Sequence, residues 1–276
     1  MKRKAIILSA LIIVLGFSVQ SVAQFTKEEL AEREKWEKFL EDAEVVSEEQ
    51  MQTREAVTSP WKIMLEKDGV RHQALWKNAQ GRMRGFMENW KWEIAAYRLD
   101  KYLGLNMVPP TVEKRFHGDL GSCQLWIDAM MSLKEKYEQD IKTPSYKVFP
   151  WNRALYLQRA FDNLIANEDR HQNQYLITKD WAMILIDHSR SFRTTKKFTT
   201  RLIYDEKYKE GSRIMKELPR AFVEKLKAMN QEVIRKVVGE YLTDKEIEAV
   251  IARRDLIIQW IENRIKEVGE DNVLYD

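Results

Sequence analysis

The chain has 276 residues, of which 44% are hydrophobic and 32% are charged. This composition allows one large domain or two smaller lobes with a shared core, and it excludes a membrane-embedded bundle. Only 10 glycines and 6 prolines occur, which disfavours long flexible linkers and low-complexity tracts.

The N-terminus has the pattern of a secretory signal peptide over residues 1–23. A basic segment at residues 2–4 precedes an uncharged apolar run at 5–19, and residues 21–23 form a small-x-small exit. We therefore expect an exported protein, either periplasmic or extracellular. The alternative is an uncleaved N-terminal membrane anchor, but the run of about 15 residues is short for a span of about 20.

The charge balance and the cysteine content narrow the range of partners. The net charge of +3 equals the three basic residues of the predicted signal peptide, so the remaining chain is formally neutral. A neutral chain gives no electrostatic argument for binding nucleic acid. Cys123 is the only cysteine, so no internal disulfide can form. We expect no nucleic-acid partner and no stable membrane span after cleavage.

The first elements after the signal peptide are a helix and a hairpin. Residues 24–53 are dense in Glu and Lys and predict a solvated, helical N-terminal extension. Residues 61–65 and 70–77 predict two strands, and the Asp-Gly pair at 68–69 is typical of the turn between them.

A helix and two extended segments follow. Apolar residues recur at helical spacing over residues 88–103, and Gly104 is a suitable C-cap. Two prolines favour an extended chain at 108–112. Residues 124–127 predict a further strand.

The chain from residue 128 onward is predicted to be mostly helical. The expected elements are helices at 132–140, 151–165, 222–240 and 244–268, and a hairpin at 175–178 and 183–186. Thr243 and Glu246 have the spacing of a capping box. The layout predicts an α+β protein with a small mixed lobe at residues 54–127 and a larger, mainly helical lobe at 128–276.

Two aspartates lie at the ends of the predicted hairpin. Asp169 precedes its first strand and Asp187 follows its second strand. Because a hairpin brings its ends together, both carboxylates can face one pocket. Phosphoryl transfer needs one carboxylate to orient or deprotonate an acceptor hydroxyl and another to hold Mg²⁺ on the phosphates. The spacing therefore suits a metal-dependent phosphotransferase.

The motifs around these aspartates resemble those of atypical kinases. Residues 167–171, Asn-x-Asp-Arg-His, resemble the catalytic loop of HipA-like kinases, phosphatidylinositol kinases and secretory kinases related to the Golgi casein kinase. Residues 186–188, Ile-Asp-His, resemble their metal-binding segment. Lys77 at a strand end resembles the phosphate-binding lysine, and Glu93 resembles its helix partner. The resemblance covers roughly residues 54–193.

This resemblance implies a bilobal, kinase-like fold that binds ATP with Mg²⁺ or Mn²⁺. The γ-phosphoryl group would pass to a hydroxyl of a protein, lipid or glycan. The turn at residues 57–60 would cover the nucleotide, and residues 124–127 would lie beside adenine. The implied residues are Asp169, Arg170 and His171 for catalysis, Lys77, Glu93, Gln124 and Trp126 for nucleotide binding, and Asp187, Asn173 and Gln174 for metal binding.

Two departures from the family pattern leave alternatives open. Gln174 stands where many relatives have a metal-binding Asn, with Asn173 one residue early, and the turn before Trp61 lacks glycine. A catalytically weak or inactive pseudokinase that still binds nucleotide is therefore the first alternative. The second is a metal-dependent hydrolase. Its ligands would be Asp169, His171, Asp187 and His188.

Overall fold

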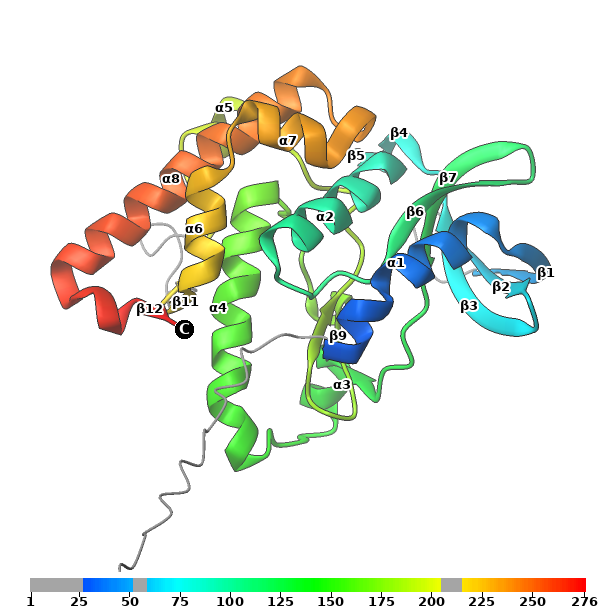
Figure 1. Cartoon of the computed structure of the whole chain (residues 1–276), viewed down its shortest axis with the longest axis horizontal. Coiled ribbons are helices and arrows are strands. Elements are labelled where there is room, and N and C mark those ends of the chain that lie inside the picture. Colours follow the sequence, from blue (N-terminus) through cyan, green and yellow to red (C-terminus); the bar gives the residue numbers. More distant parts are fainter. Residues whose placement is uncertain (1–26, 52–58, 205–214) are drawn as a thin grey trace, which may run out of the picture.

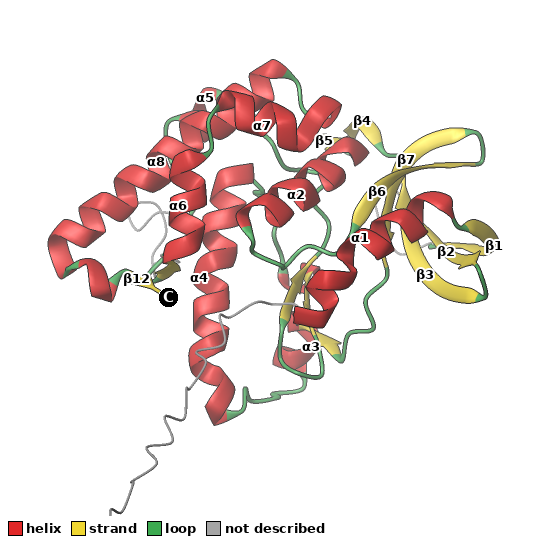
Figure 2. Cartoon of the chain, in the orientation of Figure 1, coloured by secondary structure: helices red, strands yellow, loops and turns green. Residues whose placement is uncertain are grey.

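The computed structural model of the chain describes residues 27–51, 59–204 and 215–276. Most strands gather at one end of the molecule and most helices at the other, with α2 between them (Figures 1 and 2). The predicted α+β class, with a sheet-rich N-terminal region and a helical C-terminal region, is confirmed. The predicted signal peptide at 1–23 and the first half of the predicted nucleotide cover, at 57–58, lie outside the described residues.

An antiparallel sheet of five strands dominates the N-terminal region. Its strand order is β1-β2-β3-β7-β6, and its strands are β1 Glu44–Gln50, β2 Trp61–Lys67, β3 Val70–Lys77, β6 Thr111–Phe116 and β7 Asp119–Leu125. Asp68 and Gly69 both have positive φ between β2 and β3, which confirms the predicted two-residue turn. A Cβ on Gly121 of β7 would lie 2.4 Å from the Lys77 carbonyl oxygen. Glycine therefore allows β7 to pair with the end of β3.

Two predictions for the strands of this sheet are partly wrong. The charged N-terminal segment is helical only over α1, Lys27–Asp42, and then forms the edge strand β1. Edge strands tolerate charged side chains, so charge density alone did not distinguish this strand from a helix. The strand predicted at residues 124–127 is instead the end of β7, which stops at Leu125.

A short hairpin precedes α2. It consists of β4, Gln80–Met83, and β5, Phe86–Asn89, and α2 follows at Trp90–Leu103. The helix therefore starts two residues later than predicted, at Trp90 instead of Glu88, and Glu88 belongs to β5. The Asn89 side chain caps α2 by accepting from the Lys91 N–H at 3.0 Å. Gly104 ends the helix in the left-handed region, as predicted.

The C-terminal region is built from helices around a small sheet. Its helices are α3 Leu133–Glu138, α4 Val148–Ile165, α5 Lys196–Thr199, α6 Arg220–Ala228, α7 Gln231–Val238 and α8 Asp244–Val268. Its strands are β8 Met131–Ser132, β9 Tyr175–Ile177, β10 Met183–Leu185, β11 Leu218–Pro219 and β12 Leu274–Tyr275. The β9–β10 hairpin and the capping box of α8 are confirmed. None of the described helices combines the length and the apolar character needed to cross a membrane.

The single helix predicted at residues 222–240 is wrong. The chain breaks between α6 and α7 at Met229 and Asn230. The Asn230 side chain accepts from the Val233 N–H at 2.9 Å and starts α7 as a new helix. The apolar spacing continues across the break, so periodicity alone predicted one helix.

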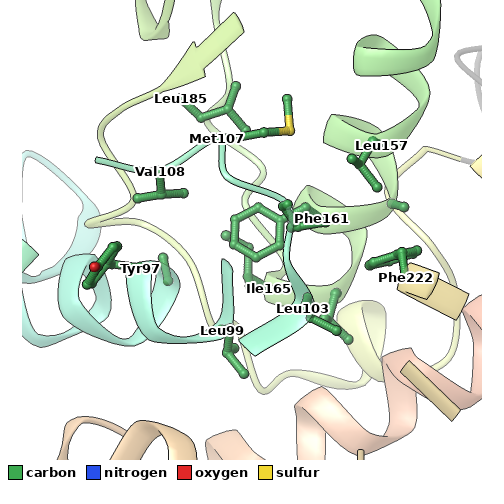
Figure 3. Packing of buried hydrophobic residues seen from close by; sticks show 14 of the residues in the cluster. Tyr97, Leu99, Leu103, Met107, Val108, Leu157, Phe161, Ile165, Leu185 and Phe222 are labelled. Atoms are coloured by element: carbon green, nitrogen blue, oxygen red, sulfur yellow. The ribbon is translucent and has the colours of Figure 1, made fainter. Parts of the chain in front are cut away.

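The larger hydrophobic core fixes α2 against α4. Phe161 of α4 is fully buried at its centre, surrounded by Leu103 of α2, Leu157 of α4 and Phe222 of α6 (Figure 3). Since α2 carries Glu93 and α4 leads into the Asp169 turn, this packing sets the relative position of two predicted site segments.

The smaller core lies between α1 and the sheet and contains Cys123. Burial raises the pKa of its thiol to about 12. The reactive thiolate is therefore rare near neutral pH. We expect iodoacetamide to leave Cys123 unmodified in the folded protein and to modify it fully in urea, as measured by mass spectrometry. Rapid modification of the folded protein would contradict the buried placement.

Candidate active site

A buried lysine and glutamate join the sheet to α2. Lys77 ends β3, and its Nζ donates to Glu93 Oε1 at 2.8 Å. Glu93 lies in the first turn of α2, whose start is fixed by the Asn89 cap. Burial alone would lower the pKa of Lys77, but Asp187 and Glu93 outweigh it, so the pKa lies above its ordinary value. Lys77 is therefore a fixed cation between the sheet and the helix.

Asp187 extends this chain of charges from the loop after β10. Its Oδ1 accepts from Lys77 Nζ at 2.9 Å, and its Oδ2 accepts from Gln174 Nε2 at 3.1 Å. Its φ of 62° lies in the left-handed region, which Asp adopts more readily than most residues. Burial would raise the pKa of Asp187, but Lys77 and Ser189 outweigh it and hold the pKa well below its usual range. The side chain is 38% exposed, so an ionised carboxylate remains accessible to a ligand.

Asp169 lies in the turn that follows α4. Ala166 ends the helix with a φ of 53°, and Asn167 Oδ1 then accepts from the Asp169 N–H at 3.2 Å. The Asp169 carboxylate is 34% exposed, and its Oδ2 accepts from Arg190 Nη1 at 3.0 Å. Arg190 lies in the same loop as Asp187. The contact therefore holds the Asp169 carboxylate against the loop that contains the second predicted aspartate.

Arg170, for which the resemblance implied a part in catalysis, forms a buried ion pair. Its guanidinium forms two bonds with the Asp162 carboxylate, at 2.9 and 3.0 Å, and both side chains are 0% exposed. Burial would lower the pKa of Arg170, but Asp162 outweighs it and raises the pKa. Nη1 also donates to the Ile186 carbonyl oxygen at 2.7 Å. Arg170 therefore ties the Asp169 turn to the residue before Asp187, which is a structural contact.

His171 and Asn173 face another part of the surface. Both line a cavity of about 540 Å³ together with Lys134 and Tyr137 of α3. His188 is fully buried, with its Nε2 2.9 Å from Arg170 Nη2, and its backbone N–H donates to Glu93 at 2.8 Å. The structure therefore does not bring together the four ligands expected for a hydrolase.

An apolar cavity lies next to the Lys77–Asp187 pair. Its volume is about 250 Å³, and it is lined by Leu75, Gln124, Leu125, Trp126, Ile127, Asp128, Ala129, Leu176 and Ile186. Lys62 Nζ lies 4.5 Å from the centre of the Trp126 ring, and Gln124 Nε2 donates to Thr111 Oγ1 at 2.9 Å. Leu75 belongs to the strand that ends at Lys77, and Ile186 precedes Asp187. The cavity therefore adjoins both charged residues and suits a flat, largely apolar group.

Three residues that sequence reasoning gave no role complete the arrangement. Glu88 of β5 is buried and accepts from Ser189 Oγ at 2.6 Å and from Arg190 Nε. Ser189 Oγ also lies 3.1 Å from Asp187 Oδ1. A sequence signal existed for Arg190, which is a cation in a loop of a predicted acidic site. Glu88 carries none, because the apolar spacing predicts it as the first residue of a helix over residues 88–103.

The oxygen donors fit a cation that is shared with phosphates. Mg²⁺ commonly binds through one or two carboxylates and completes its shell with water and substrate phosphates. Asp187 supplies one accessible carboxylate, whereas Gln174 Oε1 accepts from the His171 N–H at 3.3 Å. Among the residues with described positions, no group of three or more His, Cys, Asp or Glu side chains could hold a metal on its own. Asp187 is therefore the residue best suited to a divalent cation.

The fold and the connected Lys77, Glu93 and Asp187 side chains together define an atypical kinase-like architecture. A strand-end lysine, a helix glutamate and a loop aspartate after a β-hairpin occur in the order that the resemblance implied. The same hairpin separates Asp169 from Asp187.

Two solved kinase-family structures share this fold, Hydra Fam20 and the Golgi casein kinase. No model of a known protein family matches the chain, and no curated protein matches it by sequence. Hydra Fam20 with sugar has a TM-score of 0.63 at 17% identity, over 92% of this chain and 95% of that one. The Golgi casein kinase with Mn/ADP bound has a TM-score of 0.61 at 15% identity, over 91% and 80%. At these identities the likeness establishes the fold, and the HipA-like and phosphatidylinositol-kinase-like branches of the resemblance stay predictions.

Proposed function

We propose that this protein is an ATP-dependent phosphotransferase that uses Mg²⁺ or Mn²⁺ and a hydroxyl acceptor of a protein, lipid or glycan. The observation that carries the proposal is the position of Lys77 Nζ, 2.8 Å from Glu93 and 2.9 Å from Asp187, beside the apolar cavity. Adenine would occupy that cavity and the phosphates would extend toward Lys77. Support comes from the Golgi casein kinase, a structure of the same fold that contains Mn/ADP.

Each side chain has a distinct part in this reaction. Lys77, held by Glu93, would donate hydrogen bonds to phosphate oxygens of the nucleotide. Asp187 would hold the divalent cation, which neutralises charge on the phosphates when bound. Asp169 would accept the hydrogen bond of the acceptor hydroxyl and orient its oxygen. That oxygen bonds to the γ-phosphorus while the bond to the β–γ bridging oxygen breaks, and the hydroxyl proton passes to the Asp169 carboxylate.

We extend the proposal to the location of the protein. Export directed by residues 1–23 would place the enzyme in a periplasm or outside the cell. The alternative is that residues 1–23 are not cleaved and anchor the protein in a membrane. Support comes from the Golgi casein kinase, a Golgi enzyme with which the chain shares its fold.

A thermal-shift experiment tests nucleotide binding. About 1 mM ATP with Mn²⁺, at roughly 100 times the dissociation constant, would stabilise the folded chain by about 2.7 kcal/mol, or about 5–10 °C. Asp187→Asn removes the carboxylate that would hold the cation, so we expect the shift to fall below about 2 °C. Asp180→Asn is the matched control, because Asp180 lies in the exposed turn at the opposite end of the β9–β10 hairpin.

Measurement of ADP release completes the test. Stabilisation with ADP release and phosphate transfer supports the phosphotransferase. Stabilisation without any ADP release would select the pseudokinase. A wild-type chain with no nucleotide shift at all would overturn the proposal, and so would an Asp187→Asn shift equal to that of Asp180→Asn.

A further inference from the structure

Arg190 is held on three sides between the two regions of the molecule. Its Nη1 donates to Asp169 Oδ2 at 3.0 Å, and its Nε donates to Glu88. The guanidinium carbon also lies 4.4 Å from the centre of the Phe86 ring. Glu88 and Phe86 both belong to β5, so the hairpin before α2 fixes an arginine that contacts the proposed acceptor-orienting carboxylate.

Glu88 connects this arginine to the metal-binding loop. Glu88 is almost fully buried, and its two oxygens accept from Arg190 Nε and from Ser189 Oγ, the latter at 2.6 Å. Ser189 Oγ is in turn 3.1 Å from Asp187 Oδ1. One carboxylate of the N-terminal region therefore holds Ser189 and Arg190, which lie two and three residues after Asp187 in the same loop.

The exposure of the partners shows what the Arg190 contact contributes. A buried carboxylate such as Glu88 needs a partner, so its bond to Arg190 has a purely structural explanation. Asp169 is 34% exposed, so water has access to its carboxylate beside Arg190. The bond from Nη1 is therefore not needed to satisfy a buried acceptor, and its main consequence is to select one orientation of the carboxylate.

We propose that Arg190 is a positioning residue that orients the Asp169 carboxylate toward the acceptor hydroxyl, and that Glu88 holds Arg190 in place from the β4–β5 hairpin. This inference rests on the proposed function, because it concerns the orientation of a side chain in phosphoryl transfer. It also links the hairpin that precedes α2 to the turn that follows α4.

The test compares variants by steady-state release of ADP from Mn-ATP, with dephosphorylated casein as the acceptor probe. We expect Arg190→Gln to lower kcat by about 10–100-fold and to change the KM for ATP by less than about 3-fold. Arg190→Lys keeps a cation but loses the planar fork, so it should fall between the wild type and Arg190→Gln. Thermal melting of each variant reports its folding, and Arg190→Lys serves if Arg190→Gln does not fold.

Two further variants separate positioning from general stabilisation. If Glu88 acts through Arg190, then Glu88→Gln with Arg190→Gln should be no slower than Arg190→Gln alone. Arg193→Gln is the matched control, because Arg193 lies in the same loop and pairs with Glu168 at 3.5 Å instead of Asp169. Its kcat should stay within about 3-fold of the wild-type value.

The possible outcomes are distinct. Wild-type kcat in Arg190→Gln would overturn the inference, and so would a double variant slowed by the product of the two single effects. Equal losses in Arg193→Gln and Arg190→Gln would also overturn it. A wild-type chain that releases no ADP and shows no thermal shift with Mn-ATP would instead overturn the proposed function, and the inference with it.

Discussion

Asp169→Asn is expected to lower turnover by about 10³-fold or more, which corresponds to about 4 kcal/mol of transition-state stabilisation. Asparagine has the shape of aspartate but carries no negative charge and takes up no proton from the acceptor hydroxyl. Asp169 contacts Arg190 and the Asn167 side chain, and it is not among the residues that line the apolar cavity proposed for adenine. We therefore expect the thermal shift with Mn-ATP to stay within about 1 °C of the wild-type shift.

The measurement is ADP release at saturating ATP, with Asp180→Asn as the control. Asp180 is an exposed aspartate of the β9–β10 turn, so the same chemical change there should leave turnover unaltered. Undiminished turnover in Asp169→Asn would remove the proposed role. Lost turnover accompanied by a lost nucleotide shift would assign Asp169 to nucleotide binding instead.

The core of the site was predictable because local sequence set its geometry. Lys77 comes at the end of a strand defined by an Asp-Gly turn, and Glu93 lies in the first turn of a helix with clear apolar spacing. Asp187 follows a hairpin whose two strands are short apolar runs. Each of these elements follows from nearby residues, and the hairpin alone predicts that Asp169 and Asp187 share a pocket. The pairing of Lys77 with Glu93 was predicted only through the resemblance to atypical kinases.

The residues that were missed depend on contacts between distant segments. Glu88 was assigned to a helix, but the chain turns at Gly85 and pairs β5 with β4, which buries Glu88 against the loop that contains Arg190. Arg170 was assigned to catalysis through its motif alone. Its burial depends on Asp162, one helix turn before the end of α4, and on the left-handed conformation of Ala166 that folds the chain back.

The predicted boundaries of helices and strands were wrong where the spacing of apolar residues gave no sign of a boundary. The spacing of α6 continues into α7, and only the side-chain bond of Asn230 marks the break. The charged residues of β1 have no apolar alternation, because an edge strand exposes most of its side chains. Pairing with β2 decides the structure of β1, and the Asn230 cap decides where α7 begins. The spacing of apolar residues carries no information about pairing or capping.

The Arg170–Asp162 pair leads to the largest expected change in stability. Asp162→Ala would leave the Arg170 guanidinium buried without its carboxylate, because both side chains are 0% exposed. Loss of one partner of a buried pair costs about 3–5 kcal/mol of unfolding free energy. For a chain of this size, a loss of that magnitude corresponds to a melting temperature lower by about 6–20 °C.

Urea unfolding of two comparison variants isolates the cause. Asp140→Ala removes the partner of Lys142 in a pair whose side chains are 82% and 80% exposed, so we expect a loss below about 1 kcal/mol. Asp162→Leu combined with Arg170→Met removes both buried charges and should recover most of the stability lost in Asp162→Ala. A loss in Asp162→Ala no larger than that in Asp140→Ala would contradict the buried pair.

Because Arg170 Nη1 also holds the Ile186 carbonyl oxygen, the double variant should still turn over more slowly than the wild type. If the double variant recovers stability but not turnover, then Arg170 has a second role. It positions the loop that contains Asp187, and this role is separate from its contribution to the free energy of unfolding.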